Sequence, residues 1–401
     1  MCEYPDFFDL IPFEENSKWG YKNKNSDVIF QSQFDDEGIF PINGPYAIIR
    51  LNGLYGLIDM YGNFIFTPVY KKYSMDGIEI GTAYKGASPI NFDGKFGFIS
   101  WDKKIIIPPI FKKVKWFSEN RAAVCQNGKW GFIDETGKLV IKHRFSEARE
   151  FKEGFAIVTL AESDTIYRTK FENYQYYIDA MGSVLKTEFE INNASDFSEG
   201  MAKVGVLKSI VEYNPHFFTK PSYEEIVENS FIKRPREKFI VVHHYSYGFI
   251  NTKGELVIDL IYEDATNFKD GVAFVKSNEK WGIINKHGNL LVDAIYASIE
   301  SFSSEYFIIS DGDKYGVINN QGEVIVACQY DQILTPLFSD RRNGIIIVVA
   351  NGKQGLVSLT EKREIITCKY DEIVYFHANR YKVTLGDNSY YIDQNDTIIS
   401  Q

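Results

Sequence analysis

An aromatic residue followed by glycine recurs along this chain at a spacing close to 34 residues, and no other feature constrains its fold as strongly. The glycine of the pair occurs at Gly20, Gly56, Gly97, Gly131, Gly248, Gly282, Gly316 and Gly355, and Tyr176 and Tyr390 occupy the same place in two further copies. About ten copies of so short a unit cannot each enclose a core, so each must bury its apolar surface against its neighbours. We therefore expect a repeat array along nearly all of the 401 residues.

Each copy keeps further residues at fixed distances from the glycine. In the copy NGKWGFIDETGKLVI, residues 127–141, a second glycine follows six residues later at Gly137, an aromatic ring fourteen later at Phe145, and a phenylalanine twenty later at Phe151. The two apolar runs around Asp-x-x-Gly are typical of a hairpin, since Asp starts the turn and Gly accepts the positive φ that closes it. The NGK at 127–129 predicts a second tight turn just before the pair.

Two tight turns per copy predict a three-stranded antiparallel meander, joined to the next meander by a long crossing loop. The expected fold is all-β, with about ten meanders stacked as an open superhelix or solenoid. A propeller-like toroid is the alternative, although ordinary propellers have about four to eight blades. We divide the chain into N-terminal repeats at 1–204, an insertion at 205–246 and C-terminal repeats at 247–401, all of one continuous array.

The ring of the pair is expected to fill the seam between adjacent units. A buried ring of this size removes roughly 150–250 Å² from water. The neighbouring glycine is interpreted as a position where another backbone passes too close for a Cβ atom. The expected seam residues are Trp19, Tyr55, Phe96, Trp130, Tyr247, Trp281 and Tyr315.

Three copies, KWGFIDETGKLVI, KWGIINKHGNLLV and KYGVINNQGEVIV, resemble the WG-containing repeat family, a bacterial β-repeat of mostly undefined function. The resemblance covers nearly the whole chain and implies the fold, but it implies no particular activity. Gln175-Tyr176 and Ser389-Tyr390 lack the aromatic–glycine pair, and Gln354-Gly355 lacks the ring. These copies are atypical, and terminal ones are expected to act as caps.

The period is broken most widely between Val204 and Tyr245. Within this insertion Ser222 and Glu225 form a capping box, which predicts a short helix from Ser222 to Phe231. Insertions in repeat proteins often lie on the binding face, so we expect partner contacts here; a solvated segment that covers a seam is the alternative. The expected partner-binding residues are aromatic or basic: Phe217, Phe218, Tyr223, Lys233, Arg234, Arg236 and Lys238.

No catalytic, cofactor-binding or metal-binding constellation is found in the sequence. The six histidines include no pair at a ligand spacing, and Cys328 and Cys368, in ACQYD and TCKYD, are interpreted as small packing residues at one repeat position. The run DGDKYG at 311–316 lacks the later ligands of a calcium loop and is interpreted as a hairpin turn. We therefore expect a protein that is not an enzyme and has no cofactor.

The net charge of −10 disfavours nucleic acid as a partner and favours a basic one. No apolar run long enough to span a membrane occurs, and the start of the chain lacks the features of a signal peptide. A cytoplasmic protein is expected; the alternative is a longer precursor whose processing exposes a lipid-modified Cys2. Two function classes are kept: a non-catalytic scaffold that binds another protein, in one version an inhibitor or immunity-type protein for a basic effector, and a sensor that binds a small molecule or glycan on exposed aromatics.

Overall fold

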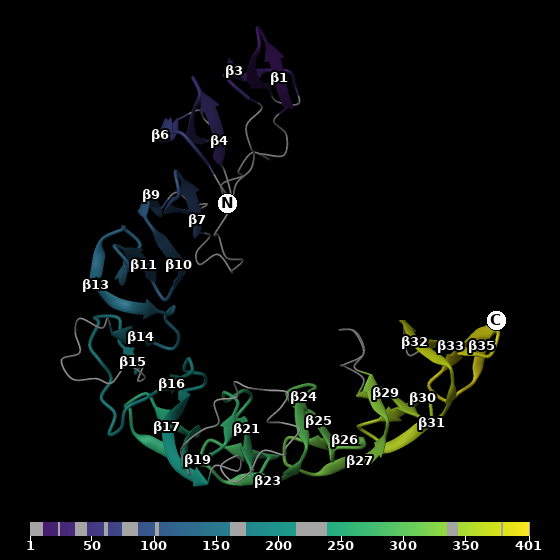
Figure 1. Cartoon of the computed structure of the whole chain (residues 1–401). Coiled ribbons are helices and arrows are strands. Elements are labelled where there is room, and N and C mark those ends of the chain that lie inside the picture. Colours follow the sequence, from purple (N-terminus) through teal and green to yellow (C-terminus); the bar gives the residue numbers. More distant parts are fainter. Residues whose placement is uncertain are drawn as a thin grey trace, which may run out of the picture. The chain divides into compact units, whose positions relative to one another are not determined.

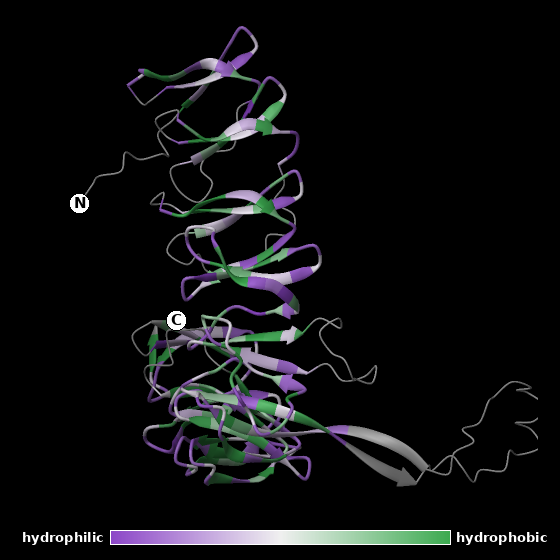
Figure 2. Cartoon of the chain, turned by 90° about the vertical axis from the view of Figure 1, so that its left-hand side faces the viewer, coloured by the Kyte–Doolittle hydropathy of each residue, from purple (hydrophilic) through white to green (hydrophobic). Residues whose placement is uncertain are grey.

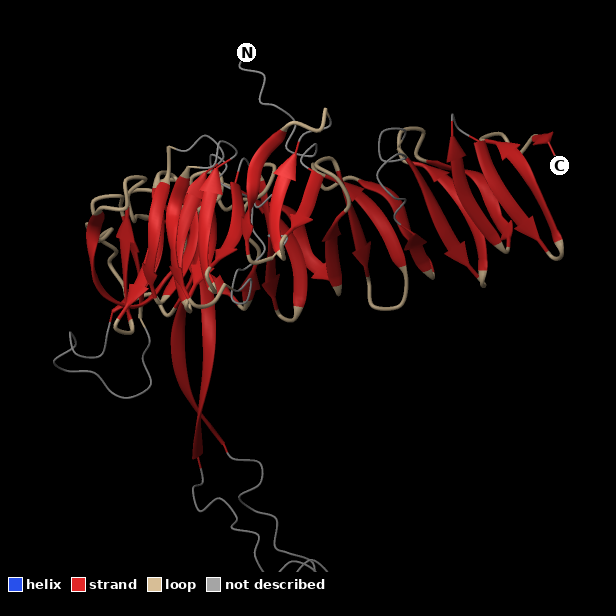
Figure 3. Ribbon diagram, turned by 90° about the horizontal axis from the view of Figure 1, so that it is seen from above, coloured by secondary structure: helices blue, strands red, loops and turns tan. Residues whose placement is uncertain are grey.

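The computed structural model describes residues 11–22, 25–36, 46–59, 63–73, 87–100, 104–160, 174–213, 239–334, 344–377 and 380–400. Every regular element in these ranges is a β-strand (Figure 3), which confirms the predicted all-β class. The predicted helix at Ser222–Phe231 lies outside the described residues. The chain divides into two compact units, Met1–Lys186 and Thr187–Gln401, called unit 1 and unit 2 below.

The described strands of unit 1 are β1 (Ile11–Glu15), β2 (Lys18–Lys22), β3 (Val28–Phe34), β4 (Tyr46–Leu51), β5 (Leu54–Asp59), β6 (Phe64–Tyr70), β7 (Ala87–Phe92), β8 (Lys95–Ser100), β9 (Ile106–Phe111), β10 (Lys113–Ser118), β11 (Arg121–Gln126), β12 (Lys129–Ile133), β13 (Leu139–Ala148), β14 (Ala156–Leu160) and β15 (Gln175–Ile178). They form three antiparallel sheets of three strands and one sheet of six, β10 to β15, with neighbours in chain order (Figure 1). The first nine strands thus form the predicted meanders.

The described strands of unit 2 are β16 (Asn193–Ala194), β17 (Met201–Tyr213), β18 (Phe239–Asn251), β19 (Leu256–Tyr262), β20 (Asp264–Ala265), β21 (Val272–Ser277), β22 (Lys280–Asn285), β23 (Leu290–Tyr296), β24 (Ser298–Ser301), β25 (Tyr306–Ser310), β26 (Tyr315–Asn319), β27 (Val324–Tyr330), β28 (Gln332–Leu334), β29 (Ile345–Ala350), β30 (Lys353–Ser358), β31 (Arg363–Tyr370), β32 (Glu372–His377), β33 (Arg380–Leu385), β34 (Asn388–Asp393) and β35 (Ile398–Ser400). They form five sheets of four strands each.

The fourth strand in these sheets corrects the prediction of three-stranded meanders. The extra strand, such as β20 or β24, is the first of its sheet and comes from the segment that was expected to be a crossing loop. Its residues are mostly polar and it has only two to four residues in β16, β20, β24 and β28, so it shows no clear apolar alternation. Edge pairing with the next strand, and not its own composition, makes it a strand.

Both predicted turns are present in the copy at 127–141. Asn127 and Gly128 have φ values of 52° and 78°, as a type I′ hairpin turn requires. In the next turn the side-chain oxygen of Asp134 accepts hydrogen bonds from the backbone N–H groups of Thr136 and Lys138, at 2.9 and 3.1 Å. Gly137, with φ of 81°, closes that turn. The Asp-x-x-Gly pattern is therefore a turn device, as expected.

The glycine of the aromatic–glycine pair is required by the neighbouring strand. A Cβ atom on Gly131 would lie 2.5 Å from the carbonyl oxygen of Ile141, and one on Gly282 would lie 2.6 Å from that of Val292. The strand pairing shifts register at this point, between Trp130 and Phe132 in the first of these copies. The missing side chain thus admits a bulge that brings the third strand over the second.

The two apolar residues after this glycine point into opposite seams. Phe132 packs in a cluster with Ala156 and Val158 of the following strand β14, whereas Ile133 packs with Phe98 of the preceding sheet. The same division holds for Val317 and Ile318, where the first faces the next repeat and the second faces away from it. Both faces of each central strand are therefore buried, and Figure 2 shows hydrophobic residues along the strands with hydrophilic ones at many turns.

The phenylalanine twenty residues after the glycine completes each seam. The rings of Phe98 and Phe117 meet edge to face with centroids 4.8 Å apart, and those of Phe132 and Phe151 do so at 5.0 Å. The seven rings that were expected to fill the seams lie at the margin of these clusters instead: Phe96 is buried, and the other six are partly buried. Each of them pairs across to the ring fifteen positions later, as Trp130 does with Phe145.

Adjacent repeats are also joined by polar contacts from a short Phe-Ser-Glu motif. The hydroxyl of Ser118 donates to the carbonyl of Phe151, and the carboxylate of Glu119 accepts from the N–H of Gly154 at 2.8 Å. In unit 2, Ser198 and Glu199 make the same two contacts to Phe268 and Gly271. Ser198 and Phe268 are 70 residues apart in sequence, so the inserted segment leaves the contact between consecutive repeats intact.

Candidate functional site

The insertion emerges from unit 2 as a long hairpin. Strands β17 and β18 pair without a register shift from Met201 and Asn251 to Tyr213 and Phe239, and Figure 3 shows them extending past the other strands of their unit. The sequence predicted only a short strand ending near Val204. All seven expected partner-binding residues lie beyond Tyr213, outside the described residues, so that prediction stands as it was made.

A second set of exposed residues, present in both units, was not singled out by the sequence reasoning. A large apolar residue begins the third strand of most repeats, usually eight positions after the glycine, and its side chain is exposed. This series comprises Val28, Phe64, Ile106 and Leu139 in unit 1 and Leu256, Leu290, Val324 and Ile398 in unit 2. The regular offset was visible in the sequence, but a periodic apolar residue is ordinarily taken for core, so only the exposure identifies it.

The exposed apolar residues are most numerous on β19 and β23. These are the last strands of two consecutive four-stranded sheets and correspond to the third strand of the predicted meander. Ile261 is 66% exposed and Ile295 is 59% exposed, and Leu256 and Leu290 are exposed at the starts of the same strands. Glycine 288, in the turn before β23, lies over the side chain of Ile258 in β19, where a Cβ atom would be 3.3 Å away. The turn before β23 therefore packs on β19 in the seam between consecutive repeats. We call the exposed residues of these two strands the β19/β23 surface and define it as Leu256, Val257, Asp259, Ile261, Leu290, Asp293 and Ile295.

Two carboxylates interrupt this apolar surface. Asp259 and Asp293 occupy equivalent positions, two residues before Ile261 and Ile295, and both are exposed. Neither carboxylate has an ion-pair partner among the described residues. Many other acidic side chains hold turns. Asp331, for example, forms an ion pair with Lys314 and accepts a hydrogen bond from the N–H of Asn351. The pKa of Asp331 is lowered mainly by the bond to Lys314, and that of Asp35 mainly by the N–H of Gly53.

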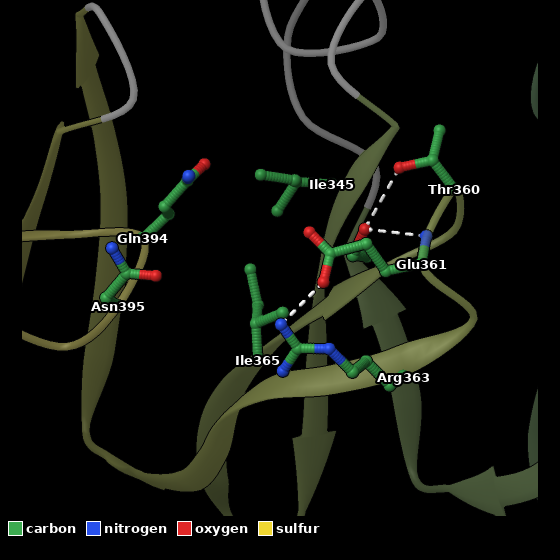
Figure 4. Close-up of a pocket in the computed structure, with 8 residues that line it drawn as sticks. Ile345, Thr360, Glu361, Arg363, Ile365, Gln394 and Asn395 are labelled. Carbon is green, nitrogen blue, oxygen red and sulfur yellow. Dashed lines mark hydrogen bonds and ion pairs between the residues drawn. The ribbon is translucent and has the colours of Figure 1, made fainter.

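A small polar pocket lies near the C-terminal end of unit 2 (Figure 4). It has a volume of about 240 Å³ and is lined by Ile345, Ser358, Thr360, Glu361, Arg363, Ile365, Gln394 and Asn395. Arg363 pairs with Glu361 at 2.5 Å, and the hydroxyls of Ser358 and Thr360 lie 3.1 Å apart. Arg363 stands where most other repeats have the exposed apolar residue, in the copy that lacks the ring of the pair. The pocket offers hydrogen-bonding groups of both charges but no aromatic wall.

Several other titratable residues are partly buried or hold turns. Cys328 and Cys368 are partly buried in different seams, and burial raises the pKa of both thiols. Burial likewise lowers the pKa of His143. Asp311 accepts backbone hydrogen bonds from Asp313 and Lys314, which confirms a turn in DGDKYG. Among the described residues no group of three or more His, Cys, Asp or Glu could hold a metal ion, and no helix there could cross a membrane.

Small antiparallel sheets that share both faces with their neighbours define a β-repeat protein. The model of the WG containing repeat matches residues 19–55, 96–130, 130–161, 247–281, 281–315 and 315–353. These segments cover more than half of the chain, so the protein belongs to the WG containing repeat family. No curated protein matches the sequence.

Solved structures give only distant similarity. A crystal structure of the eukaryotic initiation factor is 10% identical, with a TM-score of 0.37, over 88% of this chain and 94% of that one. Kluyveromyces lactis Hsv2 is 10% identical, with a TM-score of 0.26, over 68% and 89% of the two chains. Apo AztD from Citrobacter koseri is 11% identical, with a TM-score of 0.22, over 98% and 93%. At scores this low the similarity supports no conclusion about the present chain.

Proposed function

We propose that this protein is a non-catalytic interaction scaffold that binds another protein. In its most specific form it is an inhibitor or immunity-type protein that covers a basic effector in the cytoplasm. The observation that carries the proposal is the exposed apolar residue repeated on the third strands, because monomeric proteins rarely expose apolar residues in a contiguous series without a partner. The net charge of −10 favours a basic partner.

An extended array suits this role. We propose that about ten repeats stack as an open superhelix, counting the six-stranded sheet as two repeats. Such an array presents equivalent strands at regular intervals, so that weak contacts to single repeats add along one partner. The inserted hairpin, with Phe217, Tyr223 and Arg234 among its expected contact residues, provides a second contact point.

The test is affinity capture of the partner by the tagged full-length protein from its native host, followed by identification of the captured proteins. A basic protein that is retained at low salt and released at high salt is expected, because screened charges contribute to such an interface. Deletion of 207–243 tests the insertion separately. Retention of no protein, or of one that salt does not release, would contradict the proposed basic partner.

A second function, a small-molecule or glycan sensor, is favoured by the polar pocket around Arg363 and by one exposed ring pair. Phe376 is 54% exposed, and its ring lies tilted against that of the partly buried Tyr391, with centroids 5.1 Å apart. Sugars combine ring stacking with hydrogen bonds, but here the pocket and the rings supply these separately. A thermal-shift screen distinguishes this function, since a ligand at 100 times its dissociation constant adds about 2.7 kcal/mol to the free energy of unfolding. Loss of that shift in Arg363→Ala would assign the ligand to the pocket.

A further inference from the structure

We infer that the β19/β23 surface binds an extended segment of the partner that presents basic and apolar side chains in turn on one face. This inference rests on the proposed function and names the surface and the chemistry that the partner must have. An extended segment is the natural occupant because every second side chain of it points to the same face, as is the case for Asp259 and Ile261, two residues apart on β19. Its apolar side chains would cover Ile261 and Ile295, and its cations would meet Asp259 and Asp293.

Charge complementarity is the first argument for this occupant. Carboxylates within an exposed apolar surface keep it soluble, but they also exclude an apolar or acidic partner. Asp259 and Asp293 are not needed by the fold, because the equivalent residues in unit 1 are Thr67 and Lys142. Their presence in two consecutive repeats of unit 2 therefore selects what can bind there.

The accessibility of the strand edges is the second argument. β19 and β23 are each the last strand of their sheet, and neither contains proline. In unit 1 the equivalent edge strands β6 and β9 contain Pro68, Pro108 and Pro109, which lack the N–H that an added strand would need.

Two further strands at the equivalent position are protected in different ways. β13 lies inside the six-stranded sheet, and β31 carries the charged residues Arg363 and Lys369. The side chain of Lys208, from β17, donates a hydrogen bond to one backbone group of β19, the carbonyl of Leu260, at 3.2 Å. β23 therefore offers the clearer edge for strand addition, and β19 contributes mainly its side chains.

The test uses two fluorescently labelled synthetic peptides of equal length, one repeating Lys-Ser-Val-Ser and one repeating Glu-Ser-Val-Ser, so that the charged residue and valine lie on the same face of an extended chain. Their binding to the full-length protein is measured by anisotropy at low salt. We expect the lysine peptide to bind and the glutamate peptide to bind at least tenfold more weakly. The double variant Asp259→Lys/Asp293→Lys should weaken lysine-peptide binding at least tenfold, and Ile261→Ser/Ile295→Ser at least fivefold.

The matched control is Val69→Ser/Ile110→Ser, which alters exposed residues at equivalent positions of unit 1 and should change binding less than twofold. Equal binding of the two peptides, no binding of either, or an equal loss in the control variant would overturn the inference. Sedimentation of the protein alone tests a second copy as the occupant. Dimers that the Ile261→Ser/Ile295→Ser variant abolishes would also overturn it. A captured partner that still binds the Asp259→Lys/Asp293→Lys variant would overturn this surface while leaving the proposed scaffold function intact.

Discussion

Truncation of Phe132 is the most direct test of how the repeats are held together. Its side chain is fully buried and meets the ring of Phe151 at 5.0 Å, in the seam between consecutive repeats. Burial of such a ring removes roughly 150–250 Å² from water, which at about 25 cal/mol per Å² contributes about 4–6 kcal/mol as an upper bound. Mutational experience with buried phenylalanines gives about 3–5 kcal/mol. We expect a loss in that range for Phe132→Ala.

Trp130→Ala is the matched comparison, because Trp130 lies two residues away and is only partly buried. From the sequence alone, Trp130 was the ring expected to fill this seam, with a loss of about 3–5 kcal/mol on truncation. From the structure, we expect Trp130→Ala to cost about half as much free energy of unfolding as Phe132→Ala, since hydrophobic stabilisation follows the area removed from water. Urea unfolding of the full chain, followed by circular dichroism, measures both. Because repeat arrays can depart from two-state unfolding, hydrogen exchange of the β12 and β14 amides serves as a local readout. A loss at Trp130 equal to or greater than that at Phe132 would refute the seam assignment.

Three further predictions concern the turns and contacts that recur. Gly282→Ala should cost about 1–3 kcal/mol, since its Cβ atom would lie 2.6 Å from the carbonyl oxygen of Val292; a loss below this range in urea unfolding would contradict the close approach. Glu199→Ala removes the acceptor for the Gly271 N–H and should cost about 1 kcal/mol in the same assay, whereas an unchanged midpoint would show that the contact contributes nothing. The lowered pKa values of Asp331 and Asp371 mean that their stabilising contribution is complete above about pH 4 and is lost as the pH falls through the lowered values; thermal melts that do not weaken in that acidic range would contradict these ion pairs.

The fold was largely predictable from the sequence because each turn and each close approach of strands depends on residue types within a single copy. The turn at Asp134 to Gly137 and the close approach at Gly131 each depend on a residue type that the geometry requires, so they can be recognised without a structure. The fourth strand could not, because a two-residue segment such as Asp264–Ala265 of β20 becomes a strand only by pairing with a neighbour. The position of Phe132 in the seam, with its neighbour Trp130 at the margin, depends on the bulge and was likewise not readable from composition.

The candidate surface escaped sequence reasoning for a related reason. Leu256 and Leu290 repeat with the same period as the core residues, and periodicity alone does not distinguish a side chain that faces a neighbouring repeat from one that faces solvent. The expected contact residues of the insertion were chosen because they interrupt the period. The structure directs attention instead to residues that follow it.

The division between constrained and unconstrained positions supports a binding role for the third strands. The glycine, the two apolar residues after it, the turn acid and the later phenylalanine all have assigned structural contacts in each regular repeat. The outward positions are less constrained, and they vary from Thr67 and Pro108 in unit 1 to Asp259 and Asp293 in unit 2. The requirements of folding therefore do not explain which residue types occupy these outward positions. Exposed isoleucines at Ile261 and Ile295, in two consecutive repeats, are costly for solubility unless a partner covers them. For this reason the chemistry of the outward face, and not the repeat itself, is expected to distinguish the partners of one such protein from those of another.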